Sequence, residues 1–360
     1  MKEPLQARYY EHFRAAAKSA APEDFCFYDS REAPFSLYGL MLREDGAFCR
    51  LPREVAARTS NRVEALHAHT SGGRLRFVTD SVRLALWVSY PVLERVDRMS
   101  LSVSAGFDVY LEKEGKEVYH DTVIPPIDGE EGYLLSVPLT GNEVTVTLYF
   151  PLYNEVRDLK VGLLPGASLK AARPYCSSEP LLFYGSSITQ GMGASRPGMS
   201  YVARVAREWK MDFVNLGFSG ACKGEREMAL YLAKQKSAAF ILDYDHNAPT
   251  PEHLEKTHWG IYQAYRESNP DTPVLLVSRP SCFPEAEHVL RRREIIMNTY
   301  LQARAKGDRS VYFVDGLGMF RGEDPFDCVV DGLHPNDLGM KRIAEGISAV
   351  LASVWKRASF

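Results

Sequence analysis

Two adjacent serines lie between glycines in the segment G-S-S-I-T-Q-G at 185–191, directly after an apolar run. A serine hydroxyl is a weak nucleophile near neutral pH and needs a base beside it to take its proton. Histidine is the usual base, and a carboxylate next to the ring fixes its tautomer. The segment D-G-L-H-P-N-D at 331–337 offers such a pair in Asp331 and His334, which can leave one short loop on the same side. These residue types indicate acyl transfer through a serine.

Acyl transfer also needs hydrogen-bond donors for the oxyanion that forms at the attacked carbonyl, and each donor typically contributes about 3 kcal/mol. A glycine N–H and an asparagine side-chain amide can both donate. G-F-S-G at 217–220 supplies Gly220, and D-Y-D-H-N at 243–247 supplies Asn247. Both segments follow apolar runs, as the serine pair does, so these two residues and the Ser187 N–H are the candidate oxyanion donors.

The C-terminal half alternates between strand and helix patterns, which predicts a parallel sheet covered on both faces. In such a sheet ligands bind beyond the carboxyl ends of the strands, where the candidate residues fall. We therefore expect a five-stranded, doubly wound α/β domain from about residue 178 to the end. The predicted strands are 181–184, 212–216, 238–242, 274–277 and 311–314, and the predicted helices lie near 200–210, 226–236, 252–268, 288–306 and 337–355.

The N-terminal half shows the period of two that is typical of antiparallel strands, for example at 74–79, 82–88 and 144–148. Turn residues separate these runs, which favours a β-sandwich or jelly roll over about 20–165. We expect Trp87 in its core, and His67 and His69 on the polar face of a strand. The predicted domains are 1–170, with a short leading helix over 3–19, and 178–360.

In family terms, G-S-S-I-T-Q-G resembles the first block of the SGNH (GDSL-type) hydrolases, usually G-D-S-x-T-x-G. The resemblance makes Ser187 the nucleophile and puts Ser186 where aspartate is usual. N-L-G-F-S-G resembles the second block and implies Gly220 as an oxyanion donor. D-H-N is similar to a variant of the third block, with Asn247 as the amide donor, although the usual G-x-N-D is not kept. D-G-L-H-P-N-D resembles the last block, D-x-x-H, with Asp331 and His334.

The first half adds to this resemblance. S-A-G-F-D-V-Y at 104–110, preceded by R-L-P-R at 50–53, is similar to the G-x-D-L-Y region that forms a β-sandwich before some bacterial SGNH esterases. A-S-R-P-G-M-S-Y at 194–201 also resembles that subgroup. Members of it are often described as acetyl esterases that act on plant or microbial polysaccharides, so the resemblance implies a carbohydrate ester as substrate.

Each candidate residue also has a purely structural interpretation. Either serine could cap a helix, and a D-x-x-H segment is often a helix start, although Asn336 or Asp337 can cap the last helix here. Gly220 could serve a turn, and Asn247 could hold its own loop. Arg196 and Arg279 are candidates for substrate contact, although structural arginines are commoner. The acidic residues near Asn247 fit loop ordering better than a metal site, so we expect no metal.

Composition excludes several classes of function. A net charge of −3 without a basic stripe argues against nucleic-acid binding. No apolar run is long enough to span a membrane. The charged first residues lack a secretory signal, which is expected for a cytoplasmic protein or a trimmed secreted or periplasmic one.

The sequence thus predicts a cofactor-free serine esterase for small acyl esters, and the resemblance implies acetyl groups on an oligosaccharide or other carbohydrate as the substrate. Three alternatives stay open. An acyltransferase of the same fold would pass the acyl group to another alcohol, and a lipase or lysophospholipase would need a long apolar groove. A non-catalytic carbohydrate-binding protein is the alternative of another class.

Overall fold

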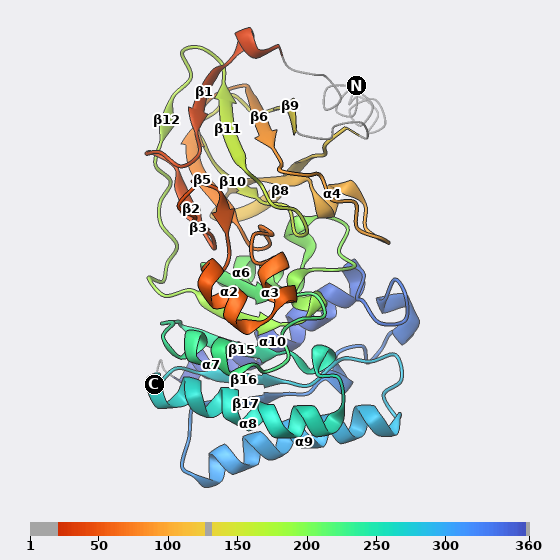
Figure 1. The fold of residues 1–360 in the computed structure, drawn as a ribbon. Coiled ribbons are helices and arrows are strands. Elements are labelled where there is room, and N and C mark those ends of the chain that lie inside the picture. Colours follow the sequence, from red (N-terminus) through yellow and green to blue (C-terminus); the bar gives the residue numbers. More distant parts are fainter. Residues whose placement is uncertain (1–20, 127–131, 358–360) are drawn as a thin grey trace, which may run out of the picture.

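The computed structural model describes residues 21–126 and 132–357, so the helix expected over 3–19 lies outside the described residues. A β-rich N-terminal half lies against an α/β C-terminal half, and two short helices, α2 and α3, lie at the junction (Figure 1). Neither half contains, in its described residues, a helix with the length and apolar character of a membrane span.

The N-terminal half is built mainly of short strands. Its helical elements are η1 (Pro22–Asp24), α2 (Arg53–Thr59), α3 (Asn61–Leu66) and α4 (Leu101–Ser104). Its strands are β1 (Cys26–Asp29), β2 (Ser36–Tyr38), β3 (Met41–Leu42), β4 (Phe48–Cys49), β5 (Arg74–Thr79), β6 (Arg83–Ser89), β7 (Phe107–Lys113), β8 (Lys116–Val123), β9 (Gly132–Pro138), β10 (Val144–Tyr149), β11 (Asp158–Leu163) and β12 (Leu169–Lys170).

Ten of these strands form two antiparallel sheets that enclose one core, and β3 and β4 pair as a separate two-stranded sheet. One sheet has the order β1-β11-β6-β9, and the other has the order β12-β5-β10-β7-β8 with β2 also paired to β5. Alternate residues point inward, as period two requires: Leu86 of one sheet and Phe77 and Leu148 of the other are fully buried in the shared core. The predicted antiparallel sandwich is therefore confirmed.

The C-terminal half carries the predicted alternation of strands and helices. Its strands are β13 (Leu181–Gly185), β14 (Phe213–Gly217), β15 (Ala239–Asp243), β16 (Val274–Val277) and β17 (Val311–Val314). Its helical elements are α5 (Ser187–Gln190), η2 (Pro197–Met199), α6 (Tyr201–Trp209), α7 (Arg226–Ala233), η3 (Asp245–Asn247), α8 (Pro251–Ser268), α9 (Glu287–Ala305), η4 (Gly316–Gly318), η5 (Pro325–Cys328) and α10 (Asp337–Arg357).

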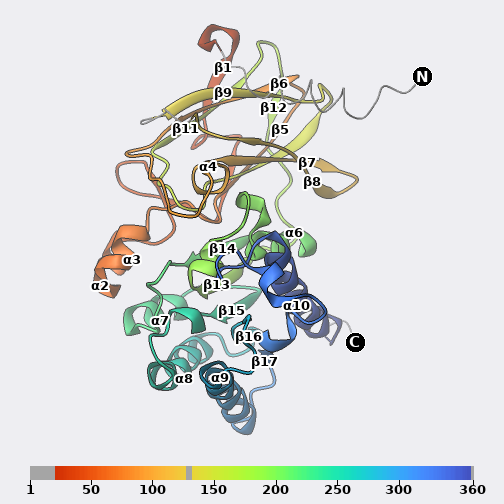
Figure 2. The same cartoon turned by 90° about the vertical axis from the view of Figure 1, so that its right-hand side faces the viewer.

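The five strands form a parallel sheet in the order β14-β13-β15-β16-β17, which confirms the flavodoxin-like fold class. The direction of the strand order reverses between β13 and β15, and the carboxyl ends beside such a point are the usual ligand site. Helices α6 and α10 cover one face of the sheet, and α7, α8 and α9 cover the other (Figure 2). The continuous apolar character of the strands follows from this two-sided burial.

The two halves share their cores. Tyr149 and Tyr153 of the N-terminal half are buried in the cluster that contains Phe183 of β13. Leu51, just before α2, and Val63, within α3, are buried in the cluster on the other face of the sheet. The N-terminal half therefore packs against the same sheet that positions the candidate residues.

Two expectations about the sandwich are wrong. Trp87 is 45% exposed, because the inward positions of β6 are Leu84, Leu86 and Val88, and its ring lies over the Lys160 ammonium instead. His67 follows α3 and is not in a strand, since the segment before it is helical. His69 forms only an isolated bridge with Glu155, and both histidines are buried at the junction.

Candidate active site

The turn between β13 and α5 places the two serines in different environments. Ser186 caps α5: its Oγ accepts a hydrogen bond from the Ile188 N–H at 3.2 Å, and its N–H donates to Thr189 Oγ1 at 3.2 Å. A Cβ at Gly185 would overlap Thr189 Oγ1, so the strand can approach this cap closely only with glycine there. Ser186 therefore has the helix-capping role expected of one of the two serines. The Ser187 hydroxyl is not used in the cap.

Ser187, His334 and Asp331 form a continuous hydrogen-bonded chain. Ser187 Oγ lies 3.0 Å from His334 Nε2, and His334 Nδ1 lies 2.8 Å from Asp331 Oδ2. Asp331 Oδ1 also accepts from the His334 N–H at 2.8 Å. Burial raises the pKa of Asp331, but the hydrogen bonds from His334 outweigh it and hold that pKa well below its usual range. Asp331 is therefore a carboxylate at neutral pH, as a partner for the imidazole must be.

The loop that carries Gly220 is tied both to the nucleophile turn and to η3. Gln190 Oε1 of α5 accepts from the Ser219 N–H at 2.9 Å, and Asn247 Nδ2 donates to the Phe218 carbonyl at 2.9 Å. Gly220 has φ +66, a conformation that favours glycine. These contacts bring Gly220 and Asn247 to the edge of the sheet where Ser187 lies, while their role as oxyanion donors stays a prediction.

Both halves of the chain match models of known protein families. Residues 178–352 match the model of the GDSL-like lipase/acylhydrolase family. Residues 25–169 match the model of the N-terminus of SGNH-type esterases. The chain belongs to the SGNH (GDSL-type) hydrolases. The resemblance stated from the sequence blocks is thereby confirmed.

Solved structures of similar proteins span nearly the whole chain. A Bacteroides ovatus protein described as a GDSL-like lipase is 29% identical with a TM-score of 0.83, over 92% of this chain and 98% of that one. A salicylyl-acyltransferase from a tetracycline biosynthetic pathway is 25% identical with a TM-score of 0.77, over 93% and 98%. A family two carbohydrate esterase from Clostridium thermocellum in complex with cellohexaose shares the fold at 15% identity, with a TM-score of 0.63 over 89% and 99%. No curated protein matches the sequence.

Both candidate arginines of this SGNH hydrolase lie in ion pairs with buried aspartates. Arg196 donates to Asp108 Oδ2 at 2.8 Å, and Arg279 lies 3.1 Å from Asp245 Oδ1. Asp245 also binds Arg292, so it orders the loop before Asn247. The sequence had offered these arginines for substrate contact, and that role stays a prediction. Within the described residues, no three histidine, cysteine, aspartate or glutamate side chains are grouped as a metal site would need.

The G-F-D-V-Y segment of β7 holds the loop that follows the nucleophile. Asp108, which is fully buried, accepts from the Gly198 N–H at 2.8 Å in addition to Arg196. The Tyr110 hydroxyl accepts a second bond from Arg196 at 2.7 Å, and a Cβ at Gly198 would overlap this ring. The segments 104–110 and 194–201, which resemble the same subgroup of the family, are therefore in direct contact.

Several supporting residues were missed from the sequence. Arg50 is fully buried, and its guanidinium donates to the Gly217 carbonyl at 2.6 Å and the His69 carbonyl at 2.6 Å. His69 Nδ1 lies 3.2 Å from Gln190 Nε2, and the Tyr153 hydroxyl donates to the Ser187 carbonyl at 3.2 Å. The only sequence feature that pointed to these residues was R-L-P-R at 50–53. It contributed to the family resemblance but did not predict a role for Arg50.

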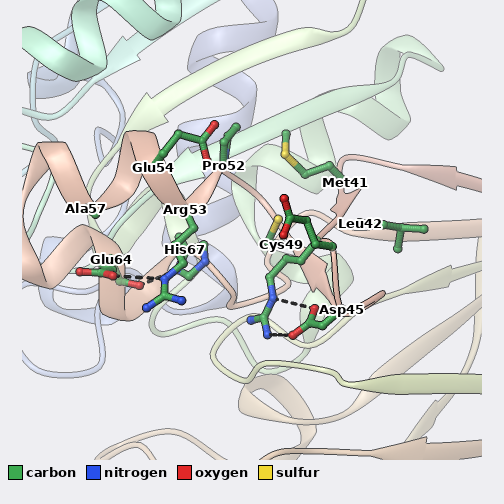
Figure 3. A pocket seen from close by; sticks show the side chains of 12 residues that line it. Met41, Leu42, Asp45, Cys49, Pro52, Arg53, Glu54, Ala57, Glu64 and His67 are labelled. Carbon is green, nitrogen blue, oxygen red and sulfur yellow. Dashed lines mark hydrogen bonds and ion pairs between the residues drawn. The ribbon is translucent and has the colours of Figure 1, made fainter.

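A separate cavity of about 770 Å³ lies between the β3–β4 hairpin and the α2–α3 pair (Figure 3). Four of its charged side chains form two pairs, Arg43 with Asp45 at 3.1 Å and Arg53 with Glu64 at 3.3 Å. None of the candidate catalytic residues lines it. This cavity is therefore distinct from the candidate active site.

Proposed function

We propose that this SGNH hydrolase is a serine esterase that hydrolyses small acyl esters, with O-acetyl groups on carbohydrates as its substrate class. The observation that carries the proposal is the unbroken chain from Ser187 Oγ through His334 to Asp331, with contacts of 3.0 and 2.8 Å. Those distances lie in the range in which a base can take the serine proton. These three side chains lie at the carboxyl edge of the sheet, where an open α/β fold binds ligands.

In the proposed mechanism, Ser187 Oγ attacks the acyl carbon while His334 Nε2 takes the hydroxyl proton. Asp331 holds the opposite ring nitrogen and stabilises the imidazolium. The Ser187 N–H, the Gly220 N–H and the Asn247 amide donate to the oxyanion. The imidazolium then protonates the leaving alcohol, and water releases the acyl group by the same steps in reverse. No cofactor is needed.

The carbohydrate part of the proposal has weaker support than the ester part. The family two carbohydrate esterase from Clostridium thermocellum shares the fold of both halves. At 15% identity that likeness concerns the fold, so it motivates the choice of first substrate only.

Acyl transfer is the second candidate function. The likeness to a salicylyl-acyltransferase, at 25% identity over 93% of this chain, favours it specifically. The same serine, histidine and aspartate would form the same acyl-enzyme, and the acyl group would then pass to an alcohol instead of water.

The deciding experiment measures acetate release from acetylated xylo-oligosaccharides by the wild type and by Ser187→Ala. We expect the variant to lose roughly 10⁴-fold or more of the activity. Equal release by both proteins would contradict the assignment of Ser187. Product analysis with an added alcohol separates hydrolysis from transfer, and a series of longer acyl chains exposes a lipase.

A further inference from the structure

Arg98 reaches the candidate active site from the N-terminal half. It lies in the segment between β6 and α4, and its Nη1 donates to Asp331 Oδ2 at 3.1 Å. The same oxygen accepts from His334 Nδ1 at 2.8 Å. The hydrogen-bonded chain therefore runs over four side chains, from Ser187 through His334 and Asp331 to Arg98.

An exposed ion pair by itself carries little weight, since such pairs contribute about 0–1 kcal/mol. The Arg98 side chain is 73% exposed, but its partner carboxylate is only 13% exposed and is already used by the imidazole. The contact also joins segments 233 residues apart. The Arg98 guanidinium therefore influences the His334 imidazole through the shared Asp331 carboxylate, even if it adds little to the stability of the fold.

The backbone around Arg98 is held in place. Val96 and Met99 pack against the core cluster that contains Phe183 of β13. Asn154 Oδ1 accepts from the Glu94 N–H at 2.7 Å, which anchors the start of the segment. Arg98 itself has φ +64, a conformation that non-glycine residues adopt only where the surroundings impose it. The segment is thus built to place this side chain.

We propose that Arg98 is a positioning residue through which the N-terminal half holds the Asp331 carboxylate and tunes its interaction with His334. This inference rests on the proposed function, because it assigns a role within the same hydrogen-bonded chain. The guanidinium competes with the imidazole for Oδ2 and offsets part of the negative charge of Asp331. Both effects weaken the stabilisation of the imidazolium, so a protonated ring is less favourable with Arg98 present.

Two titratable groups near the Ser187 hydroxyl keep a fixed charge around neutral pH. Asp331 stays ionised, because hydrogen bonds from His334 hold its pKa well below the usual range in spite of burial. His246 of η3 lies near enough to His334 for the two rings to interact electrostatically, and burial lowers the pKa of His246 to about 3. His334 also contacts the Ser187 hydroxyl, and Asp331 contacts the Arg98 guanidinium. An acid limb in the activity profile therefore reports the ring that contacts Ser187.

The test compares the pH profile of kcat/KM on acetylated xylo-oligosaccharides for the wild type, Arg98→Gln and Arg98→Lys. We expect the acid midpoint of Arg98→Gln to lie about 0.5 pH unit higher at low salt, as two charges about 6 Å apart would give when water screens them, because Arg98 is mostly exposed. Added salt screens the exposed cation and should bring the two profiles together. Arg98→Lys should keep the wild-type midpoint. Arg309→Gln, an exposed charge before β17 at the other edge of the sheet, controls for net charge.

The second readout needs no substrate. NMR titration of the His334 ring should show the same upward displacement of the midpoint in Arg98→Gln. If the midpoints of the wild type and Arg98→Gln agree in both measurements, or if Arg98→Gln loses activity equally at every pH, the proposal is wrong. A wild type without esterase activity would defeat the proposed function alone, because the ring titration would still decide the role of Arg98.

Discussion

At the scale of single residues, substitutions of the neighbouring Ser186 and Ser187 should have opposite effects on stability and activity. Ser186→Ala removes the cap of α5, so the free energy of unfolding should fall by about 1 kcal/mol while much of the activity remains. Ser187→Ala removes no cap and should unfold close to the wild type without measurable ester hydrolysis. Urea unfolding and acetate release, measured on both variants, give the two signatures. A stable, active Ser187→Ala beside an inactive Ser186→Ala would mean that the nucleophile was assigned to the wrong serine.

The candidate catalytic residues could be picked out from the sequence because their types are few and their order along the chain is distinctive. Ser187 follows the predicted strand β13, and Asp331 and His334 come just before the predicted helix α10. The residues that support them were not predictable in this way. Arg50 binds carbonyl oxygens of β14, and any long donor in any segment could do so. Its role depends on tertiary packing, which leaves no local pattern.

At the scale of elements, the carboxyl end of β15 carries an aspartate whose protonation should control stability. Asp243 is buried, and its Oδ2 accepts from the Tyr201 hydroxyl at 2.8 Å and from Thr189 Oγ1 at 3.2 Å. Burial raises the pKa of Asp243 to about 7, although these two hydrogen bonds oppose the shift. One side chain thus joins β15, α5 and α6 below the nucleophile turn.

The sign of the pH dependence follows from that shift. The folded state binds this proton more tightly than the unfolded chain, so the stabilisation is complete below about pH 4 and is lost as the pH rises through about 7. A shift of about three pH units corresponds to about 4 kcal/mol. Asp243→Asn lacks this titration and should gain stability relative to the wild type as the pH rises from about 4 to about 7. Urea unfolding at several pH values measures the difference, with the exposed Asp271→Asn as a control. A difference that does not change with pH would show that Asp243 is ionised throughout.

Periodicity predicted the elements well and side-chain environments less well. Every strand of the parallel sheet lies within one residue of its expected position, because burial on both faces leaves a continuous apolar run. In β6 the alternation was visible, yet Trp87 was assigned to the core because its neighbours are apolar. Trp87 stands on the outer face with Phe27 and Lys160, since the phase of a strand decides the side and not hydrophobicity. The prediction that His67 and His69 lie on the polar face of a strand was wrong because helices at the junction bury residues that a strand would expose.

At the scale of the whole molecule, the two halves are joined by polar contacts as well as by shared cores. Asp108 of the sandwich binds Arg196 and the Gly198 N–H, both in the loop after the nucleophile. Arg74 of β5 pairs with Asp212, just before β14. The predicted division into 1–170 and 178–360 stays a prediction about domains, but these contacts argue that the halves unfold together.

Asp108→Asn tests this coupling. The substitution keeps the size of the side chain but removes the charge that faces Arg196, and breaking a buried ion pair typically costs about 3–5 kcal/mol. Asp158→Asn is the matched control, because Asp158 also pairs with an arginine at 3.0 Å but is 39% exposed, and exposed pairs contribute about 0–1 kcal/mol. We expect Asp108→Asn to lower the unfolding midpoint of both halves and to reduce kcat, since the loop after Ser187 loses its anchor. Early unfolding of the sandwich alone, with full activity kept, would mean that the N-terminal half only covers the active site and does not hold it.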